Sequence, residues 1–557
     1  MRRALFDPRA AALAVAAVSG AMALYVLAYT EYPYPIWRGL IFQYLLRHQD
    51  LAGLALVAAL ALGACLPATH QPALAFVEKL GERPWLVALV AFLALCAGML
   101  LLAHGHALAG DEYLTLMQSR IFAAGHLTGQ YPPDLLPWLM PDHYRYRWIM
   151  VSANGGIAAT YWPGFALVLT PFTLLGASWA CNPALAALSL VLMAKLAGRL
   201  AGGPQASGWA MLFALASPGF AGLALSYFSM TAHLLASLAF AWLLLEPTPR
   251  RLVGAGLVGS AALLLHQPVP HMLFAAPWLV WLALQPRGRR NLALIALGYL
   301  PGVAGGVAWA AFLREMHGFI IAAPFASDGE LGNRIGNLIW YWQMRTSWIF
   351  EAPAGYAIGA RLGEQVRLWA WAAPGLPLLA AAGWWMSRRE RALNLLALSF
   401  GATVLGYFLV RFDQGYGWGA RYVHPAFGAL PVLAAAAMAR LKDRPEGAAL
   451  RGWAAAAAAA SLVFATALRG GQIEAFMAEH LSHRPPYVSG ERQVVLIKHD
   501  VDYYFDWDLV QNDPFLRSPT LVLLSRGAEE DARMMAGRFP RARRVYQGLY
   551  GEVWTLD

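Results

Sequence analysis

Charged residues are scarce in this chain of 557 residues: Asp, Glu, Lys and Arg together make up 13% of it, against about 25% in soluble domains. Hydrophobic residues make up 59%. This balance excludes an ordinary soluble protein. The formal net charge of +10 does not indicate nucleic-acid binding, because the basic residues cluster in short loops between apolar stretches. The positive-inside rule of membrane proteins produces this clustering.

Cysteine and the common nucleotide motifs are also nearly absent. The three cysteines, Cys65, Cys96 and Cys181, lie in or beside apolar segments without metal-ligand spacing, so we interpret them as small core residues rather than a disulfide framework. The chain has no nucleotide fingerprint, phosphate loop, nucleophile elbow or zinc-ligand pair. It also shows no internal repeat between its halves, which argues against a rocking transporter.

Long apolar stretches are what the chain does have. A membrane crossing needs roughly 20 mostly apolar residues, and this length predicts about thirteen transmembrane helices in a mainly α, polytopic membrane protein. The predicted crossings are residues 9–29, 51–67, 85–104, 181–199, 207–223, 227–246, 252–266, 270–285, 292–313, 367–386, 393–410, 423–440 and 450–468. The first apolar stretch runs past Ala21-Met22-Ala23 to Ala28, which favours a retained anchor over a cleaved signal peptide.

Basic clusters set the expected orientation. The thirteen predicted crossings place all seven basic clusters on the cytoplasmic side, provided that the apolar stretch 162–177 does not cross. The clusters are Arg2 and Arg3, Lys79 and Arg83, Lys195 and Arg199, Arg250 and Arg251, 287–290, 388–391 and 440–451. Pro163, Gly164 and Pro171 make a spanning helix less favourable there. We therefore predict an interfacial or re-entrant segment at 162–177, with the outer face on the periplasmic or extracellular side of a bacterial inner membrane.

Two domains follow from this topology. Residues 1–468 form the multi-pass domain, with large outer loops at about 105–180 and 314–366, and residues 469–557 form a small extracytoplasmic α/β module. The apolar runs Val494 to Ile497 and Thr520 to Leu524 predict its strands. Between them, the acidic stretch that starts at His499-Asp500 invites a metal-site interpretation, but turns and a solvated face are favoured.

An acidic pair, Asp111-Glu112, follows within ten residues of the apolar run from Trp85 to His104. A carboxylate just outside the hydrocarbon keeps its charge near pH 7 and reaches the head group of a lipid whose tail lies in the bilayer. This position suits chemistry on a lipid-linked substrate.

Several motifs, in this order, resemble the C-type glycosyltransferase (GT-C) superfamily, whose multi-pass members use polyprenyl-phosphate-linked sugars. They are GDEYLTLMQSRIFAAGHL, TYWPGFALVLTPFTLLG, FSMTAHLLASLAFAWLLL, the His266-Gln267-Pro268 break and GYGWGARYVHPAFGALPVLA. The resemblance covers most of residues 85–440. It implies transfer of a sugar with inversion at the anomeric carbon, and Asp111 matches the acidic position of the family.

Such a reaction needs a base at the nucleophile and positive charge at the leaving phosphate. Asp111 is the candidate base, and shielding from water is expected to raise its pKa toward neutrality. Glu112 is expected to orient the acceptor, hold a cation or pair with a basic residue. The alternative for Asp111 is a helix cap in the outer loop.

Arg421 is the candidate for the donor phosphate, because it follows Gly415, Gly417 and Gly419 in a short outer loop where a charged fork can bind phosphate oxygens. The alternative is an arginine that only extends from a helix end to the interface. Four histidines are expected near the same face. His266 and His424 are candidates for phosphate binding, and His233 and His271 for substrate binding.

No cofactor is certain, although Asp111, Glu112 and His266 are candidate ligands of a divalent cation. Aromatic residues beside charges are typical of sugar sites. On this basis Tyr131, Tyr161, Asp328 and Glu330 are further candidates for substrate binding. An aromatic belt at the membrane interface would look the same.

The sequence therefore predicts an inverting glycosyltransferase. It would move a sugar from a polyprenyl-phosphate donor to an envelope glycan, lipid or protein at the outer face of the membrane, with no nucleic-acid partner. The alternatives are a transporter or flippase of lipid-linked sugars and a non-catalytic envelope assembly protein. A flippase is expected to bury charge in mid-membrane rather than gather it at one surface.

Overall fold

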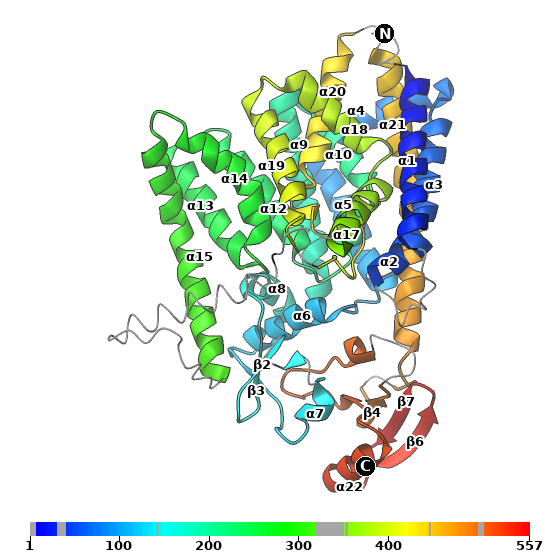
Figure 1. Cartoon of the computed structure of the whole chain (residues 1–557), viewed down its shortest axis with the longest axis vertical. Helices are drawn as coiled ribbons and strands as arrows, with labels where there is room; N and C mark the ends of the chain where they lie inside the picture. The colour runs from blue at the N-terminus through cyan, green and yellow to red at the C-terminus, as the bar shows by residue number, and fades with distance from the viewer. Residues whose placement is uncertain are drawn as a thin grey trace.

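The computed structural model in Figure 1 describes residues 7–30, 41–141, 144–145, 148–317, 350, 355–410, 412–444, 447–488, 490–499 and 506–556. A bundle of long helices fills the upper part of the view. Short helices, small sheets and the C-terminal module lie together at its lower end.

Seven helices among the described residues are long and apolar enough to cross a membrane. They are α1 (Pro8–Tyr29), the continuous unit α2–η2–α3 (Ile41–Leu45, Leu46–Asp50, Leu51–Gly63), α5 (Pro84–Leu101), η5–α9 (Ser178–Ala180, Cys181–Ala201), α15 (Gly288–His317), η6–α20 (His424–Ala426, Ala429–Lys442) and α21 (Gly447–Ser482). A bent pair, α10 (Gly203–Leu215) and α11 (Pro218–Ala224), makes an eighth if it is counted as one span. The predicted number of thirteen is therefore not confirmed.

Shorter helices occupy most of the remaining predicted crossings. They are α12 (Met230–Leu244), α13 (Pro249–Leu264), α14 (Val269–Ala283), α17 (Tyr356–Ala370), α18 (Leu376–Ser387) and α19 (Arg391–Tyr407), and α4 (His70–Glu82) lies outside every predicted crossing. Helix α8 (Gly164–Leu174) has 11 residues and a length of about 16 Å. It is too short to cross a hydrocarbon core of roughly 30 Å, as expected for this segment.

Two predicted crossings are wrong as single straight helices. The stretch 207–223 bends by 67° between α10 and α11, because Pro218 at the start of α11 has no N–H with which to continue the preceding helix. The stretch 367–386 is divided between α17 and α18, and Gly375 in the connection has a φ of 74°, which only glycine adopts readily.

Side chains that face outward from the bundle are apolar. Leu24, Leu89, Leu93 and Leu405 are all at least half exposed, and such exposed leucines on long helices fit a lipid environment rather than water. The interior is filled by alanine, leucine and large aromatic residues such as Trp209 and Trp453, which are almost completely buried.

The segment predicted as the first outer loop folds as a compact layer below the bundle (Figure 1). It contains α6 (Gly110–Ala123), α7 (Leu136–Leu139) and a three-stranded antiparallel sheet of order β1-β3-β2, with β1 (Gly129–Gln130), β2 (Ile149–Val151) and β3 (Gly156–Ala159). The Gln118 side chain accepts a hydrogen bond from the backbone N–H of Ala159 at 2.9 Å. This bond fixes α6 against β3 and so positions the acidic pair.

The C-terminal module is a mixed four-stranded sheet of order β5-β4-β7-β6 with one helix, and it confirms the predicted α/β module. Its elements are β4 (Gln493–Ile497), η7 (Asp506–Leu509), β5 (Thr520–Leu524), α22 (Ala528–Arg538), β6 (Arg543–Gly548) and β7 (Gly551–Thr555). Strands β4 and β5, which the sequence predicted, pair in parallel. The domain boundary expected at 468/469 falls within α21, whose 36 residues extend for about 54 Å.

Candidate active site

Asp111 and Glu112 lie in the first turn of α6, where the positive end of the helix dipole favours carboxylates. Neighbouring residues on a helix point about 100° apart, and the two side chains have different surroundings. The Asp111 side chain is 23% exposed, whereas Glu112 is 2% exposed. Asp111 is therefore the member of the pair that a substrate can reach.

Three segments distant in sequence meet at the Asp111 carboxylate. One oxygen accepts a hydrogen bond of 2.5 Å from the Tyr161 hydroxyl, just before α8. The other lies 3.2 Å from Nη1 of Arg421, in the loop between α19 and η6. The structure thus brings together three residues that the sequence singled out separately, a carboxylate, a phenol and a guanidinium.

The loop that carries Arg421 has a defined shape. Gly415, Gly417 and Gly419 all have positive φ values, of 58°, 114° and 75°, which side-chain-bearing residues rarely adopt. The buried side chain of Gln414 closes the loop, since it accepts from the Arg421 N–H at 2.9 Å and donates to the Gly419 carbonyl at 2.8 Å. The sequence therefore builds a rigid turn that presents one arginine.

The Arg421 guanidinium lies over the Phe228 ring, 4.4 Å from its centroid. Its side chain is 9% exposed, and its Nε has no hydrogen-bond partner among the described residues. Buried guanidinium donors are costly when unpaired. Arg421 is thus a largely dehydrated cation with donor capacity left for an anion.

Aromatic residues enclose the other side of Asp111. The ring of His266 lies 4.3 Å from that of Tyr161, centroid to centroid, and Trp148 approaches the same tyrosine edge-on at 5.7 Å. Trp309 of α15 donates from its indole N–H to the Tyr161 carbonyl at 2.8 Å. This packing fixes the phenol that donates to Asp111, and it places His266 at the site as expected.

The pKa values of the two carboxyl groups are shifted in opposite directions. The prediction that the pKa of Asp111 is raised is therefore wrong. Burial acts to raise the pKa of Asp111, but Arg421, His266 and the Tyr161 hydroxyl together hold this pKa below its usual value. Burial raises the pKa of Glu112 to about 8. The sequence argument considered only loss of water at Asp111 and did not include the arginine beside it.

Glu112 points into the protein. One of its oxygens accepts a hydrogen bond of 2.6 Å from the backbone N–H of Tyr227, which lies between α11 and α12. Among its three expected roles, pairing with a basic residue is not seen in the contacts of the described residues. The bond to Tyr227 instead ties α6 to the helical bundle.

His266 is neutral at physiological pH, because burial lowers its pKa to about 4 even though Asp111 acts in the opposite direction. No group of three or more His, Cys, Asp or Glu side chains capable of holding a metal ion occurs in the part of the chain that the structure describes. Asp111, Glu112 and His266 therefore do not assemble there into a metal-ligand set. The Asp111 oxygens are instead engaged by Tyr161 and Arg421.

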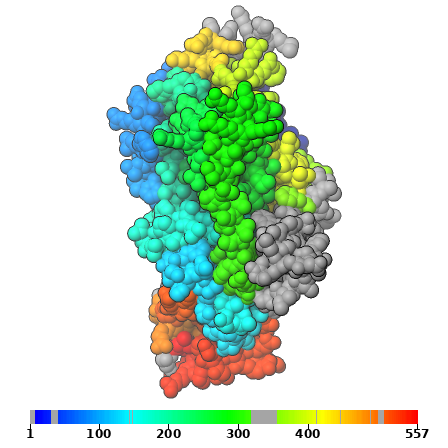
Figure 2. Space-filling view, turned by 90° about the vertical axis from the view of Figure 1, so that its left-hand side faces the viewer, coloured from blue at the N-terminus to red at the C-terminus, as the bar shows by residue number. Residues whose placement is uncertain are grey.

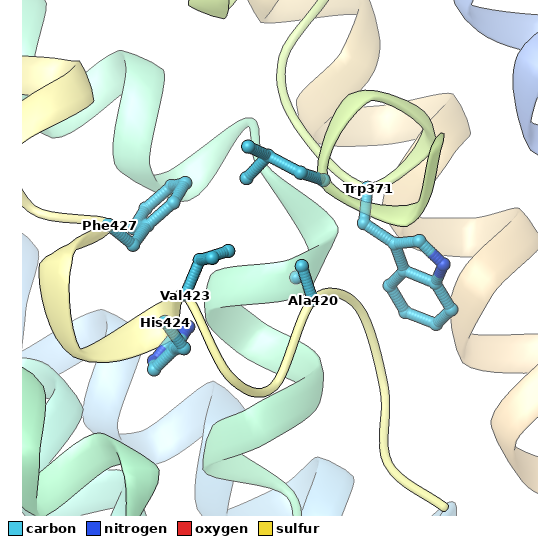
Figure 3. A pocket seen from close by; sticks show the side chains of 7 residues that line it. Trp371, Ala420, Val423, His424 and Phe427 are labelled. Carbon is cyan, nitrogen blue, oxygen red and sulfur yellow. The ribbon is translucent and has the colours of Figure 1, made fainter. Parts of the chain in front are cut away.

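His424 and His271 have other partners in the structure. His424 lines a small cavity with Trp371, Ala420, Val423 and Phe427, and Figure 3 shows its ring below that of Phe427. The cavity volume of about 10 Å³ holds about one water molecule, not a phosphate. His271 bonds to the Tyr299 hydroxyl at 2.6 Å, between α14 and α15.

Two further candidates are buried without a described contact to Asp111 or Arg421. His233 in α12 is 1% exposed, and Tyr131 is 2% exposed. The Tyr131 hydroxyl lies 3.4 Å from that of Tyr113, in the packed layer beneath α6. This burial leaves no surface for a sugar to stack on. Asp328 and Glu330 lie outside the described residues.

A second group of buried charges was missed by the sequence analysis. Asp50, at the end of η2, lies 3.2 Å from Nε of Arg367 in α17 and 3.1 Å from Nη2 of Arg469 in α21. Arg361 and Glu364 of α17 form another buried pair at 2.9 Å. The signal was present, because positions 361, 364 and 367 recur every three residues and share one face of a helix, but 361 and 364 were assigned to an outer loop and 367 to the start of a crossing.

Comparisons with known proteins support the fold. No family model matches the sequence, and no curated protein matches it. The crystal structure of ArnT from Cupriavidus metallidurans bound to undecaprenyl phosphate matches with a TM-score of 0.54 and 15% identity, over 84% of this chain and 97% of that chain. The chain is therefore an integral membrane protein that shares the fold of ArnT, which confirms the expected mainly α, polytopic membrane fold.

Proposed function

We propose that this protein is an inverting glycosyltransferase that moves a sugar from a polyprenyl-phosphate donor to an envelope glycan, lipid or protein at the outer face of the membrane. The observation that carries the proposal is the partly exposed pair of Asp111 and Arg421, which places a proton acceptor beside a cation whose Nε has no hydrogen-bond partner among the described residues. The shared fold with ArnT, whose crystal structure contains undecaprenyl phosphate, supports a lipid-linked donor.

The proposed reaction is a single displacement. The acceptor hydroxyl attacks the anomeric carbon of the sugar as the bond from that carbon to the phosphate oxygen breaks. The electron pair leaves with the lipid phosphate, and the proton of the attacking hydroxyl passes to Asp111. Arg421 stabilises the charge that develops on the leaving phosphate.

The resting ion pair explains how Asp111 serves as base despite its lowered pKa. When the donor phosphate binds to Arg421, the guanidinium divides its charge between two anions. The stabilisation of the Asp111 carboxylate then weakens, and its pKa rises toward the value that proton transfer needs. Tyr161 keeps the carboxylate oriented through its hydrogen bond of 2.5 Å.

The position of the charges favours an enzyme over a flippase. Asp111, Arg421 and His266 come together around Tyr161 at the start of α6, and Figure 1 shows α6 in the layer beneath the long helices. A carrier that moves a charged lipid head group across the bilayer needs polar groups along the path through its middle.

Replacing Asp111 by Asn tests the proposal. Loss of the base is expected to reduce transfer about 10²- to 10⁴-fold, with an unchanged amount of protein in the membrane. Mass spectrometry of membrane lipids and surface glycans should then show accumulation of one polyprenyl-phosphate sugar and loss of the matching sugar from an envelope product. Asp134→Asn is the matched control, because Asp134 is a carboxylate of the same loop whose side chain is 59% exposed.

Unchanged lipids and glycans in cells that carry Asp111→Asn would remove Asp111 as the base. An equal defect in the Asp134→Asn control would show that the loop tolerates no change of charge, and would equally count against a specific role for Asp111.

A further inference from the structure

A large cavity lies where the C-terminal module meets the first outer loop. Its volume is about 810 Å³, within the range of roughly 300–1,000 Å³ that ligand pockets occupy. Leu496 and Leu524, near the carboxyl ends of the parallel strands β4 and β5, contribute to it. The start of α22, the β6–β7 hairpin, and Pro137 and Pro141 of the outer loop complete the lining. In Figure 2 the C-terminal module lies directly against the cyan outer loop.

One acid of the lining, Asp531, is fully used inside the protein. One carboxylate oxygen accepts from the Trp138 indole N–H at 2.8 Å and from the backbone N–H of Arg526 at 3.0 Å. The other accepts from the Ser525 hydroxyl at 2.5 Å. Because Trp138 belongs to α7, its bond to Asp531 also holds the segment 105–180 to the module.

The second acid, Glu552, is also engaged. It accepts from Arg544 at 3.0 Å and from the Trp554 indole N–H at 2.9 Å.

Lys498 is exposed, and its ammonium group has no ion-pair or hydrogen-bond partner in the described part of the chain. The cavity therefore offers a positive charge, an indole ring and polar groups such as the side chain of Gln547.

The module that forms the cavity is bonded directly to the helix of the acidic pair. The Tyr113 hydroxyl, in α6, donates to the Asn512 carbonyl at 2.9 Å and accepts from the Asn512 N–H at 3.1 Å. The Asn512 side chain in turn makes two hydrogen bonds with the backbone of Val522 in β5. A ligand held in the cavity is thus fixed relative to Asp111, two residues before Tyr113.

We propose that this cavity binds the saccharide part of the acceptor, and that the bound saccharide carries an acidic group that meets Lys498. An indole face and polar side chains are suited to sugar rings and their hydroxyls, and the ammonium group adds preference for a carboxylate or phosphate on the sugar. The proposal rests on the proposed function, since it names the class of acceptor for the same site.

The test measures saccharide binding without any transfer. The purified full chain in lipid nanodiscs is titrated with tetragalacturonate as the acidic probe and with chitotetraose as the uncharged probe. Tetragalacturonate is expected to bind more tightly. Lys498→Glu should weaken it by about threefold or more, from the usual strength of exposed charge pairs, and Lys498→Arg should retain binding.

Arg533→Glu is the matched control, because Arg533 is an exposed cation of α22 that does not line the cavity. Equal weakening by Arg533→Glu, no effect of Lys498→Glu, or equal affinity for both probes would overturn the proposal. Asp111→Asn should leave tetragalacturonate binding unchanged. If this variant binds normally and also transfers normally, the proposed function fails while the binding site stands.

Discussion

Two clusters of one carboxylate and its arginines differ mainly in their access to solvent. Asp111 and Arg421 lie 3.2 Å apart, with side chains that are 23% and 9% exposed. Asp50 lies at nearly the same distances from Arg367 and Arg469, but these three side chains are 0–2% exposed. The comparison teaches that the ion pair alone does not mark a reactive site. Access to solvent does, because Nη1 of Arg367 in the sealed cluster also lacks a hydrogen-bond partner among the described residues.

The sealed cluster supports the open one. Arg367 donates from Nη2 to the Gly417 carbonyl at 2.9 Å, and Gly417 belongs to the turn that presents Arg421. Asp50 also accepts from the Trp371 indole N–H at 2.6 Å, so that η2, α17 and α21 are joined at one point. We infer that the sealed cluster is structural and holds the backbone behind the site.

The largest expected effect is a loss of stability when the buried carboxylate Asp50 is replaced, and it tests the contrast between the buried and the exposed cluster. Asp50→Asn leaves two buried guanidinium groups without their counterion, which costs about 3–5 kcal/mol when one partner of a buried pair is removed. Thermal unfolding of the purified variant in nanodiscs should show a large drop in melting temperature. Asp111→Asn, at the more exposed cluster, should lower it far less. Similar losses for both variants would break the comparison.

The next largest effect separates orientation from charge at the open site. Tyr161→Phe removes the hydroxyl that donates to Asp111. A hydrogen bond to a charged group contributes about 1.5–3 kcal/mol, so transfer should fall about 10- to 100-fold with little change in donor affinity. Tyr546→Phe, at an exposed tyrosine of β6, is the control. Full activity in Tyr161→Phe would show that Asp111 needs no such partner.

The last effect is on the pH dependence of stability and concerns Glu112, the buried neighbour of Asp111. Its pKa in the folded protein is about 8, against an ordinary value of 4.5. The folded state therefore keeps a proton that the unfolded state loses, so this contribution to stability is full below about pH 4.5 and is lost as the pH rises to about 8.

Glu112→Gln removes this titration while keeping an oxygen for the Tyr227 N–H. The melting temperature of the wild type should fall more steeply than that of Glu112→Gln between pH 5 and pH 8. Parallel curves for the two proteins would contradict the raised pKa of Glu112.

Much of this arrangement was predictable from local sequence. The length of the apolar stretches predicted a polytopic helical fold, and short apolar runs predicted strands β4 and β5. The three glycines before Arg421 indicated a loop with a special backbone conformation. The contact between Asp111 and Arg421, 310 positions later in the chain, was not predicted. The sequence predicted only that both residues lie on the same side of the membrane.

The sequence could not predict which side chains surround each charged group. The lowered pKa of Asp111 depends on Arg421, His266 and Tyr161, which reach it only through tertiary packing. The burial of Asp50 was missed for the same reason, because a charge at the edge of an apolar run looks like an interfacial residue until its partners are known.

The most direct test of the central claim, that Arg421 binds the phosphate of a polyprenyl-linked substrate, is a binding measurement. Undecaprenyl phosphate is titrated into the purified protein in nanodiscs, and bound lipid is measured by native mass spectrometry for the wild type, Arg421→Gln and the control Arg250→Gln, at an exposed arginine in the first turn of α13. The account predicts affinity about 10- to 100-fold lower for Arg421→Gln and unchanged for the control. Equal affinity in all three proteins would contradict it.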